Sequence, residues 1–273
     1  MNNNIPGIFL VTRPEEKSLD FIRALSSAGV QTRSLPMISI EPIKILSDNE
    51  AIEKKFLTLL NCDLVIFISS YAVNILDNFL KILDLGWPNK LKCIAIGSQT
   101  AKSVQDKGWS LYNKSIFNDS NHQQTSESLL SLPPLKEVLN KNIIIVRGVG
   151  GREFLSDILK KRGANVEYFE LYNRISKSYE LKELTDSLGI EPEKSEVSAI
   201  LFASGETLQS FYENIQKYKL FNKVKKIQLI VPSERIRKIA LNLGFLYVKC
   251  TINASHSAFL DEILSMPNMR KVK

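Results

Sequence analysis

Short apolar runs recur along the chain, and each is followed by a polar turn and then by apolar residues at helical spacing. Continuous apolar runs are typical of strands covered on both faces, and their alternation with helices predicts parallel βαβ units. We therefore expect an α/β fold with parallel sheets. The runs predicted to form strands are residues 8–12, 64–69, 93–97, 143–147, 199–204 and 227–231.

The order of these elements repeats within the chain. A helical pattern that stops at Gly29 follows the first strand, and a second one that stops at Gly163 follows the fourth. In and around these two helical patterns, three matching residues are 134 positions apart. Three further matches elsewhere are 135 positions apart, and this nearly constant spacing predicts an internal duplication. The matched residues are Arg13 with Arg147, Leu25 with Leu159, Gly29 with Gly163, Phe67 with Phe202, Ser69 with Ser204, and Ile96 with Val231.

Two extended segments connect the predicted halves. Residues 34–45 alternate apolar and polar positions around two prolines, and residues 166–176 occupy the equivalent place after the second helix. Segments at equivalent points can pair as a two-stranded linker between lobes. We predict a discontinuous lobe of residues 1–37 plus 174–273 and a continuous lobe of residues 38–173, with a ligand in the cleft between them.

The size and composition of the chain fit two packed cores, because 44% of its 273 residues are apolar. Three cysteines lie far apart, which predicts buried, reduced thiols rather than disulfides. The N-terminal sequence lacks a secretory pattern, and no apolar stretch is long enough to span a membrane. Without a heptad run or a long apolar helix face, a cytoplasmic monomer is expected.

The formal net charge of +7 favours an anionic partner, which leaves nucleic acid, a membrane surface or an acidic small molecule. Nucleic-acid binders usually concentrate Lys and Arg in blocks with interleaved aromatics. The densest basic runs here, residues 160–162 and 223–226, are short and typical of solvated helix faces. The pattern favours an acidic small molecule, with no nucleic acid or membrane as partner.

The usual metal, nucleophile and nucleotide motifs are missing from the sequence. His122 and His256 stand alone in polar stretches, so both are predicted to be solvated loop residues and no metal or other cofactor is expected. There is no G-x-S-x-G elbow. The segment GVGGRE at 148–153 follows a strand, but it lacks the last glycine of a dinucleotide loop and the Lys-Ser/Thr of a phosphate loop.

Small hydroxyl residues recur where a predicted strand meets a helix. Such residues commonly cap helices, and this alternative stays open for each of them. In parallel sheets, however, these junctions share the carboxyl edge, where helix N-termini can bind an anion with several carboxylates. The candidates at these junctions are Thr12, Ser69, Ser70, Ser98, Thr100, Ser204 and Ser233.

Eight short motifs in order resemble the uroporphyrinogen-III synthase family along essentially the whole chain. The family has two flavodoxin-like lobes joined by a two-stranded linker, which agrees with the repeat found above. The motifs are LVTRP at 10–14, FISSYAV at 67–73, AIGSQTA at 95–101, TSESLL at 125–130, RGVGGREFL at 147–155, GANVEYFELYNR at 163–174, FASGETL at 202–208 and VPSERIRKIALNLGF at 231–245.

The resemblance implies a cofactor-free lyase of tetrapyrrole biosynthesis, on the route to haem and sirohaem. Its substrate would be hydroxymethylbilane, a linear tetrapyrrole with eight carboxylates, handed over from hydroxymethylbilane synthase. The reaction closes the ring to uroporphyrinogen III with inversion of ring D and loss of water. Since the bilane closes unaided to the wrong isomer, the enzyme must chiefly hold and orient it.

The resemblance also implies roles for single residues. Tyr172 matches the family tyrosine proposed to assist loss of the hydroxyl, with packing against a lobe as the alternative. Ser69, Ser204 and Thr100 match residues that bind substrate carboxylates. The remaining candidates for substrate binding are Thr12, Ser70, Gly148, Gly150, Ser233 and Arg235, and further arginine candidates are Arg13, Arg147 and Arg152.

The chain departs from the family pattern at two places. Ile68 stands where many members carry threonine, and the second G-x-x-T-A motif has Pro232 for glycine and Arg235 for threonine. A guanidinium at that position could grip a carboxylate directly. Two other classes of function stay open: a non-catalytic relative that only binds tetrapyrroles and, because of the net charge of +7, a nucleic-acid-binding protein.

Overall fold

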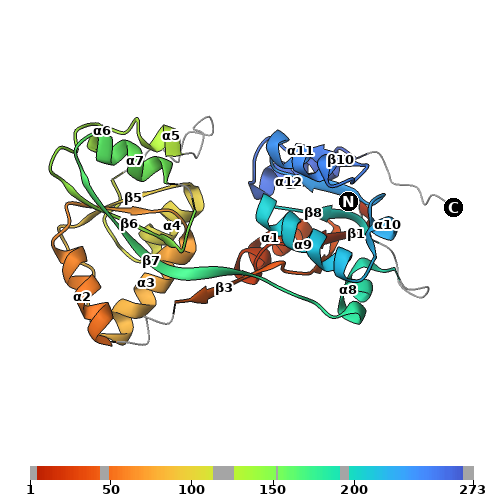
Figure 1. The fold of residues 1–273 in the computed structure, drawn as a ribbon, viewed down its shortest axis with the longest axis horizontal. Helices are drawn as coiled ribbons and strands as arrows, with labels where there is room; N and C mark the ends of the chain where they lie inside the picture. Colours follow the sequence, from red (N-terminus) through yellow and green to blue (C-terminus); the bar gives the residue numbers. More distant parts are fainter. Residues whose placement is uncertain (1–4, 44–48, 113–125, 152, 191–196, 267–273) are drawn as a thin grey trace. The chain divides into compact units, whose positions relative to one another are not determined.

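The computed structural model describes residues 5–43, 49–112, 126–151, 153–190 and 197–266. These residues form two compact units (Figure 1). Unit 1 comprises Met1–Ile40 and Ile175–Lys273, and unit 2 comprises Glu41–Arg174. Unit 2 is therefore continuous in sequence and inserted into unit 1. The lobe boundaries expected from the sequence, at 37/38 and 173/174, stay a prediction for the domains as independent folding units.

Unit 1 is a five-stranded sheet in the order β10-β9-β8-β1-β2, and its central strands pair in parallel. Alternate residues of the same strands belong to two hydrophobic clusters, one under α8, α9 and α11 and the other under α1 and α12. Both faces of the sheet are covered, which explains the continuous apolar runs. The elements are β1 Ile5–Val11, α1 Glu15–Ser27, β2 Val30–Ser34, α8 Leu181–Leu188, β8 Val197–Leu201, α9 Gly205–Lys217, α10 Phe221–Val224, β9 Gln228–Val231, α11 Glu234–Asn242, β10 Val248–Cys250 and α12 His256–Leu264.

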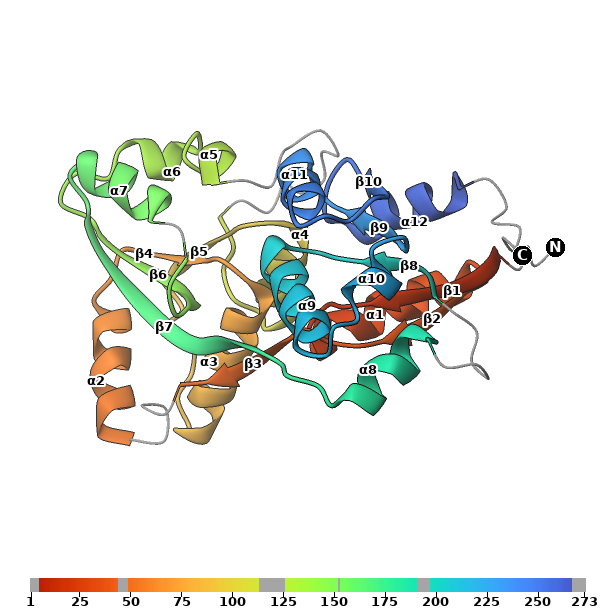
Figure 2. The same ribbon diagram turned by 45° about the vertical axis from the view of Figure 1, so that its right-hand side comes forward.

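Unit 2 has a sheet in the order β3-β7-β6-β4-β5, in which β7, β6, β4 and β5 pair in parallel. Helices α5, α6 and α7 cover one face and α3 and α4 the other, as Figures 1 and 2 both show. The predicted α/β fold with parallel sheets is thereby confirmed. The elements are α2 Asn49–Leu60, β4 Leu64–Phe67, α3 Ser70–Ile82, β5 Lys92–Ala95, α4 Ser98–Asp106, α5 Ser126–Leu129, α6 Pro133–Lys136, β6 Asn142–Gly148, α7 Phe154–Lys161 and β7 Asn165–Ser176.

Corresponding strands lie in the same spatial order in the two sheets, although the chain forms them in a different order. Strands β2, β1, β8 and β9 of unit 1 correspond to β7, β6, β4 and β5 of unit 2. An isolated bridge between Cys93 and Leu111 takes the place of the β9–β10 pair. The strands that come first in unit 1 thus come last in unit 2. This arrangement accounts for the nearly constant spacing between matched residues in the sequence.

The two connecting segments pair with each other, as the sequence predicts. Strand β3 (Ile38–Pro42) lies beside the long strand β7 in both ribbon views (Figures 1 and 2). The backbone N–H of Ile43 donates to Leu171 at 3.1 Å, and that of Lys177 donates to Met37 at 2.9 Å. The partners run in opposite directions along the chain, so this pair is antiparallel.

The thiols and histidines partly correct the sequence-based expectations. Cys93 is buried, but Cys62 and Cys250 are only partly buried, and all three are free thiols. Burial raises the pKa of the Cys62 thiol to about 12, so the group stays protonated at neutral pH. His256 begins α12 and packs against the ring of Phe21 at 5.0 Å, so its prediction as a solvated loop residue is wrong. His122 lies outside the described residues.

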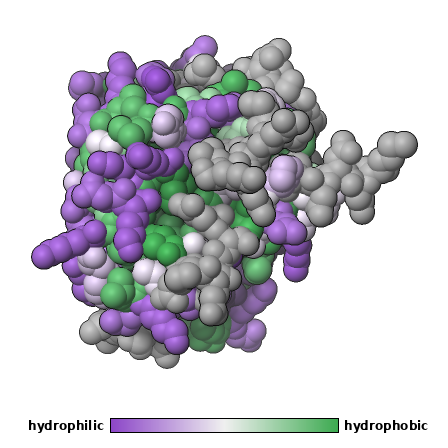
Figure 3. Space-filling model, turned by 90° about the vertical axis from the view of Figure 1, so that its right-hand side faces the viewer, coloured by the Kyte–Doolittle hydropathy of each residue, from purple (hydrophilic) through white to green (hydrophobic). Residues whose placement is uncertain are grey.

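Hydrophobic residues also reach the surface, where Figure 3 shows them between hydrophilic ones on one face of the molecule. Tyr247 and Ile252 flank the edge strand β10 and are 55% and 89% exposed. The three-residue length of β10 limits pairing with another chain at this edge. Among the helices that the structure describes, none combines the length and the apolar character needed to cross a bilayer.

Candidate functional site

The site is built where the helices of unit 2 change from one face of the sheet to the other. Helix α3 follows β4 and covers one face, whereas α7 follows β6 and covers the opposite face. Strands β4 and β6 are neighbours, so their carboxyl ends form the switch point at which α/β sheets usually bind ligands. Ser69 follows the first of these strands as the cap of α3, and Gly148 ends the second strand.

Ser69 caps helix α3. Its backbone is extended, and its Oγ accepts a hydrogen bond from the Ala72 N–H at 3.2 Å. Ser70, the first helical residue, is buried. Ser69 therefore caps a helix, as one of the two alternatives predicted, and its hydroxyl also has a second partner.

That second partner is Tyr172 of β7, whose phenolic oxygen lies 2.8 Å from Ser69 Oγ. Tyr172 is only 3% exposed, and the ring of Tyr71 lies beside it at a centroid distance of 5.9 Å. Ser69 is partly exposed. A buried phenol is thus hydrogen-bonded to a more accessible hydroxyl at the positive end of a helix dipole.

Tyr172 reaches Ser69 because of an irregularity between β6 and β7. The strands stay in register up to the pair Arg147 and Glu170, and the next pair is Gly148 with Tyr172. Leu171 is the extra residue of this bulge. Regular alternation would place Tyr172 on the same face as Glu170, and the bulge turns it to the opposite face, where α3 lies.

Gly148 makes room for the tyrosine ring. A Cβ atom at this position would lie 2.5 Å from Cε2 of Tyr172, closer than side chains tolerate. The next residue, Val149, donates its N–H to the carbonyl of Tyr172 at 2.7 Å. Gly148 therefore has a packing role that the sequence analysis did not foresee when it grouped the residue with substrate ligands.

The Gly150 N–H is also engaged within the protein. It donates to Oε1 of Glu170 at 3.2 Å, and Arg147 donates to the same oxygen through Nε at 3.2 Å and Nη2 at 3.1 Å. The Arg147 guanidinium lies 3.7 Å from the centroid of the Tyr168 ring. Arg147 and Gly150 thus bind a carboxylate, but it is one of the protein's own. Arg152 lies outside the described residues.

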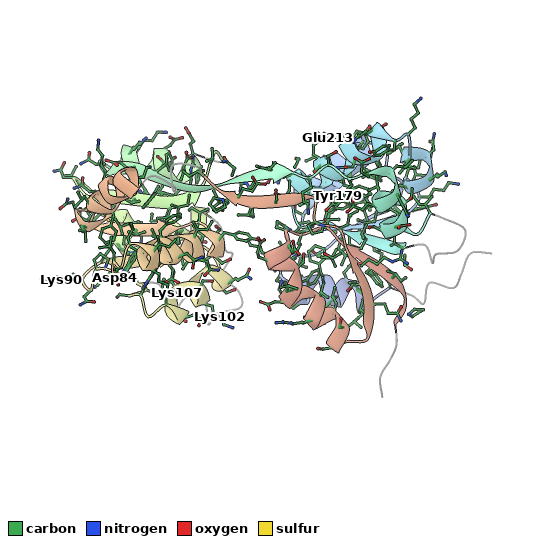
Figure 4. The ribbon with its side chains drawn as sticks, turned by 90° about the horizontal axis from the view of Figure 1, so that it is seen from below. Asp84, Lys90, Lys102, Lys107, Tyr179 and Glu213 are labelled. Atoms are coloured by element: carbon green, nitrogen blue, oxygen red, sulfur yellow. The ribbon has the colours of Figure 1, made fainter. Side chains whose placement is uncertain are left out.

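Thr100 lies in the first turn of α4, the helix beside α3, and it is buried. The cap of α4 is Gly97, which supplies no side-chain bond to the first-turn amides. Asp77 of α3 and Lys107 (Figure 4) join the two helices at 2.7 Å. Burial acts to raise the pKa of Asp77, but the bonds from Lys107 and Lys81 outweigh it and lower that pKa below its usual value.

In unit 1 the equivalent edge carries hydroxyl groups that already have partners within the protein. Thr12 is fully buried and donates its hydroxyl to the Leu201 carbonyl at 2.7 Å. Ser204 caps α9 in a reciprocal capping box with Thr207. Thr12 therefore presents no surface to a ligand in this structure, and the capping alternative holds for Ser204.

The cap of α11 lies beside this edge. Ser233 accepts from the Ile236 N–H at 3.4 Å, and Arg235 in the first turn is exposed. A guanidinium nitrogen of Arg235 lies 3.9 Å from where a Cβ of Gly205 would stand, at the start of α9. The exposed cation and two neighbouring helix N-termini thus come together on unit 1, and they suit a carboxylate.

Arg13 and Tyr179 are held within unit 1. Arg13 donates to the Ala254 carbonyl at 2.8 Å and lies over the rings of Phe21 and Phe259 at 4.5 and 5.2 Å. Tyr179 (Figure 4) donates its hydroxyl to the Pro36 carbonyl at 2.6 Å, and burial raises its pKa to about 12. Since a carbonyl can only accept, Tyr179 has one fixed orientation of its proton, whereas Tyr172 faces a hydroxyl that can donate or accept.

The comparisons with known proteins identify the family of the chain. Residues 20–250 match the family described as uroporphyrinogen-III synthase HemD. The chain belongs to the uroporphyrinogen-III synthase family. The resemblance predicted from the motifs is thereby confirmed, together with its class of lyase in tetrapyrrole biosynthesis.

Relatives that carry the name uroporphyrinogen-III synthase include proteins of Escherichia coli K12 and Salmonella typhimurium LT2. Each is 30% identical to this chain, with 92% of the chain and 97% of the relative covered. Among solved structures, uroporphyrinogen-III synthetase from Helicobacter pylori 26695 matches with a TM-score of 0.60 at 16% identity, covering 96% of this chain and all of that one. A mutant synthase from Thermus thermophilus gives 0.55 at 16% identity, with 94% and 98% covered. Both structures support the fold.

Two residues of the site escaped the sequence analysis. Tyr71 lies in the quoted FISSYAV motif, and Glu170 lies two positions before Tyr172 in FELYNR. The sequence feature that could have identified Glu170 is its carboxylate, two positions from the expected proton donor Tyr172. In the part of the chain that the structure describes, no group of three or more His, Cys, Asp or Glu side chains could hold a metal ion.

Proposed function

We propose that this chain closes hydroxymethylbilane to uroporphyrinogen III, with inversion of ring D and loss of water, and that Tyr172 and Ser69 deliver the proton for the departing hydroxyl. The observation that carries the proposal is the 2.8 Å contact between the buried phenol and the partly exposed serine at the start of α3. General acids work when they lie within hydrogen-bond reach of the leaving group.

Two protons move together as water is lost. Ser69 gives its hydroxyl proton to the ring A hydroxyl as the C–O bond breaks, and Tyr172 gives its own proton to Ser69 Oγ. Water leaves with the electrons of that bond, and the bilane becomes an azafulvene cation. The negative charge remains on the Tyr172 phenolate, beside the positive end of α3.

The later steps depend on how the bilane is held. Ring D attacks through its substituted carbon to form a spiro intermediate, which opens and recloses in the inverted orientation. The proton released at the end returns to the Tyr172 phenolate, so the protein is restored. Because the substrate supplies the electron push from its pyrrole nitrogens, the protein contributes mainly position and one proton.

Carboxylates of the bilane are proposed to bind at helix N-termini. In unit 2 the candidates are the first turns of α3 and α4, which include Ser70 and Thr100. In unit 1 they are the first turns of α9 and α11, which Ser204 and Ser233 cap, together with Arg235. Backbone amides and one exposed guanidinium suit this role. The net charge of +7 supports it. Thr12 and Gly150 are left out because their hydrogen-bonding groups are engaged within the protein, and Gly148 is left out because the Tyr172 ring packs against it.

A coupled assay tests the function. Hydroxymethylbilane is generated in situ, the protein is added, and the oxidised porphyrin isomers I and III are separated. We expect isomer III to rise with protein concentration, because unaided closure gives isomer I. If a folded sample yields isomer I alone, the activity is refuted, and binding of the bilane by the same sample would identify a non-catalytic relative.

We further propose that the protein acts as a cytoplasmic monomer, receives its substrate from hydroxymethylbilane synthase and supplies the haem and sirohaem routes. Light scattering coupled to size exclusion measures the mass directly, with 30.9 kDa expected for one chain. A mass of twice that value would replace the monomer with a dimer.

A further inference from the structure

Glu170 holds the segment that follows β6 onto β7. One of its carboxylate oxygens accepts from Nε and Nη2 of Arg147 and from the Gly150 N–H, all at 3.1–3.2 Å. The side chain of Arg147 is 9% exposed and that of Glu170 is 31% exposed, so water screens this pair only in part. Charge-assisted bonds of this kind fix geometry more firmly than neutral ones.

The Glu170 carboxylate belongs to the residue directly before the bulge in β7. Glu170 and Arg147 form the last regular pair between the strands, and Tyr172 and Gly148 form the first pair after the extra residue. The loop is held twice, since Val149 N–H donates to the Tyr172 carbonyl at 2.7 Å and Gly150 N–H donates to Glu170. The Glu170 side chain therefore contacts Arg147 before the bulge and Gly150 after it, and this bulge orients Tyr172.

We infer that Glu170 is the positioning residue of Tyr172. Its carboxylate binds Arg147 and Gly150 on the two sides of the bulge and thereby keeps the phenolic oxygen at Ser69. This inference rests on the proposed function, because Tyr172 is the proton donor of that reaction. Glu170 itself does not touch the substrate, since a carboxylate would repel the carboxylates of the bilane.

The inference also assigns a role to Arg147. A buried arginine near a glycine-rich turn suggests an anion site, but its charge is already balanced by Glu170. We therefore expect Arg147 to support the bulge and to contribute nothing directly to substrate affinity. Removal of Glu170 would take a carboxylate partner away from a buried guanidinium, so the uncharged isostere glutamine is included beside alanine.

The decisive experiment is a double-mutant cycle with Tyr172→Phe. Glu170→Ala is expected to lower kcat by about fivefold or more with KM within about twofold, and to have no further effect on kcat in the Tyr172→Phe background, because coupled residues are not additive. Glu170→Gln retains an acceptor oxygen for both donors and should recover most of kcat. Glu167→Ala, an exposed glutamate on the same strand, is the matched control and should leave kcat unchanged.

A second measurement does not depend on turnover. The eight tyrosines are labelled with 13C at the phenolic carbon, and the signal lost in Tyr172→Phe identifies Tyr172. We expect Glu170→Ala to move this signal and Glu167→Ala to leave it in place. Thermal melts establish that each variant is folded, and Glu170→Leu, which also lacks an acceptor oxygen, takes the place of alanine in both measurements if the alanine variant does not fold.

Two results would overturn the inference. The first is an equal loss of kcat from Glu170→Ala in the presence and absence of the Tyr172 hydroxyl. The second is a Tyr172 signal that does not respond to Glu170→Ala. If wild type makes no isomer III, the proposed function fails, and the NMR result alone then decides whether Glu170 positions Tyr172.

Discussion

Ser69 in unit 2 and Ser204 in unit 1 occupy equivalent places in the two sheets. Each follows a central strand, adopts an extended backbone and accepts a hydrogen bond from the N–H three residues on. Ser204 closes its hydrogen bonding locally with Thr207, whereas Ser69 turns to Tyr172 of another strand. The same cap is thus a finished local structure in one unit and part of a longer-range pair in the other.

The difference arises from the strand beside the cap. Counted at the offset of 134 residues, Glu170 and Tyr172 correspond to Pro36 and Ile38, which have neither a carboxylate nor a hydroxyl. Both units therefore have the helix cap, while the tyrosine and the glutamate are present in unit 2 alone among these matched positions. The residues shared by the two units thus form the scaffold, and the residues proposed to carry the chemistry are those that differ between the units.

The largest expected effect comes from removing either hydroxyl of the unit 2 pair. Tyr172→Phe and Ser69→Ala should each lower kcat by at least about tenfold. A loss of this size is at or below the lower end of the rate acceleration that general acids usually provide, because the substrate supplies part of the electron push. Ser204→Ala removes the equivalent cap and should cost about 1 kcal/mol of stability with kcat retained. Steady-state assays and urea unfolding measure both quantities.

Equal loss of kcat in Ser69→Ala and Ser204→Ala would abolish the distinction between the two units. Unchanged kcat in Tyr172→Phe would remove this residue from the mechanism. Circular dichroism of every variant serves as the control for folding.

A smaller effect is expected at Gly148, whose place in unit 1 is taken by Pro14 at the same offset of 134. Gly148→Ala would put a methyl group 2.5 Å from the Tyr172 ring, so we expect it to destabilise the protein by about 1–3 kcal/mol and to lower kcat. Gly86→Ala is the matched control, because no atom lies within 4 Å of the added carbon.

The double variant Gly148→Ala with Tyr172→Ala sharpens the result. Removal of the ring relieves the clash, so the alanine at 148 should cost less stability in this background. A cost that is the same with and without the ring would show that contact with the Tyr172 ring is not the reason for the glycine.

The smallest expected effect is a pH dependence in unit 1. Burial, followed by the charge of Arg13, lowers the pKa of His256 below its ordinary 6.5. The unfolded chain therefore binds a proton more readily than the folded one as pH falls through about 6.5, and the free energy of unfolding decreases there. Urea unfolding at pH 7.5 and 5.5 should show a smaller difference in His256→Gln than in wild type, and equal differences would contradict this assignment.

The sequence predicted the fold well, because the apolar runs are long, continuous and punctuated by caps and glycines. All six expected strands occur, and Gly29 and Gly163 follow α1 and α7 with positive φ. The strands β2 and β10 were not expected, since they are short and only partly buried.

The site was less predictable, because its geometry depends on an irregularity. Tyr172 and Ser69 were both candidates, but no spacing in the sequence shows that they touch. Their contact requires the bulge at Leu171 and the open space at Gly148, and both arise from the pairing of β6 with β7. Thr12 and Gly150 were assigned to the ligand because a motif does not show that a group already has a partner in the protein.

The insertion of unit 2 into unit 1 also determines the order in which the protein can assemble on the ribosome. The central strand β1 is made before unit 2, yet its neighbour β8 begins only at Val197, after unit 2. Unit 2 is complete in sequence at Arg174, before that neighbour exists. We therefore expect the unit that carries Tyr172 to fold first during synthesis, while the N-terminal βα segment waits for its sheet. Unit 1 thus begins before unit 2 and is completed after it.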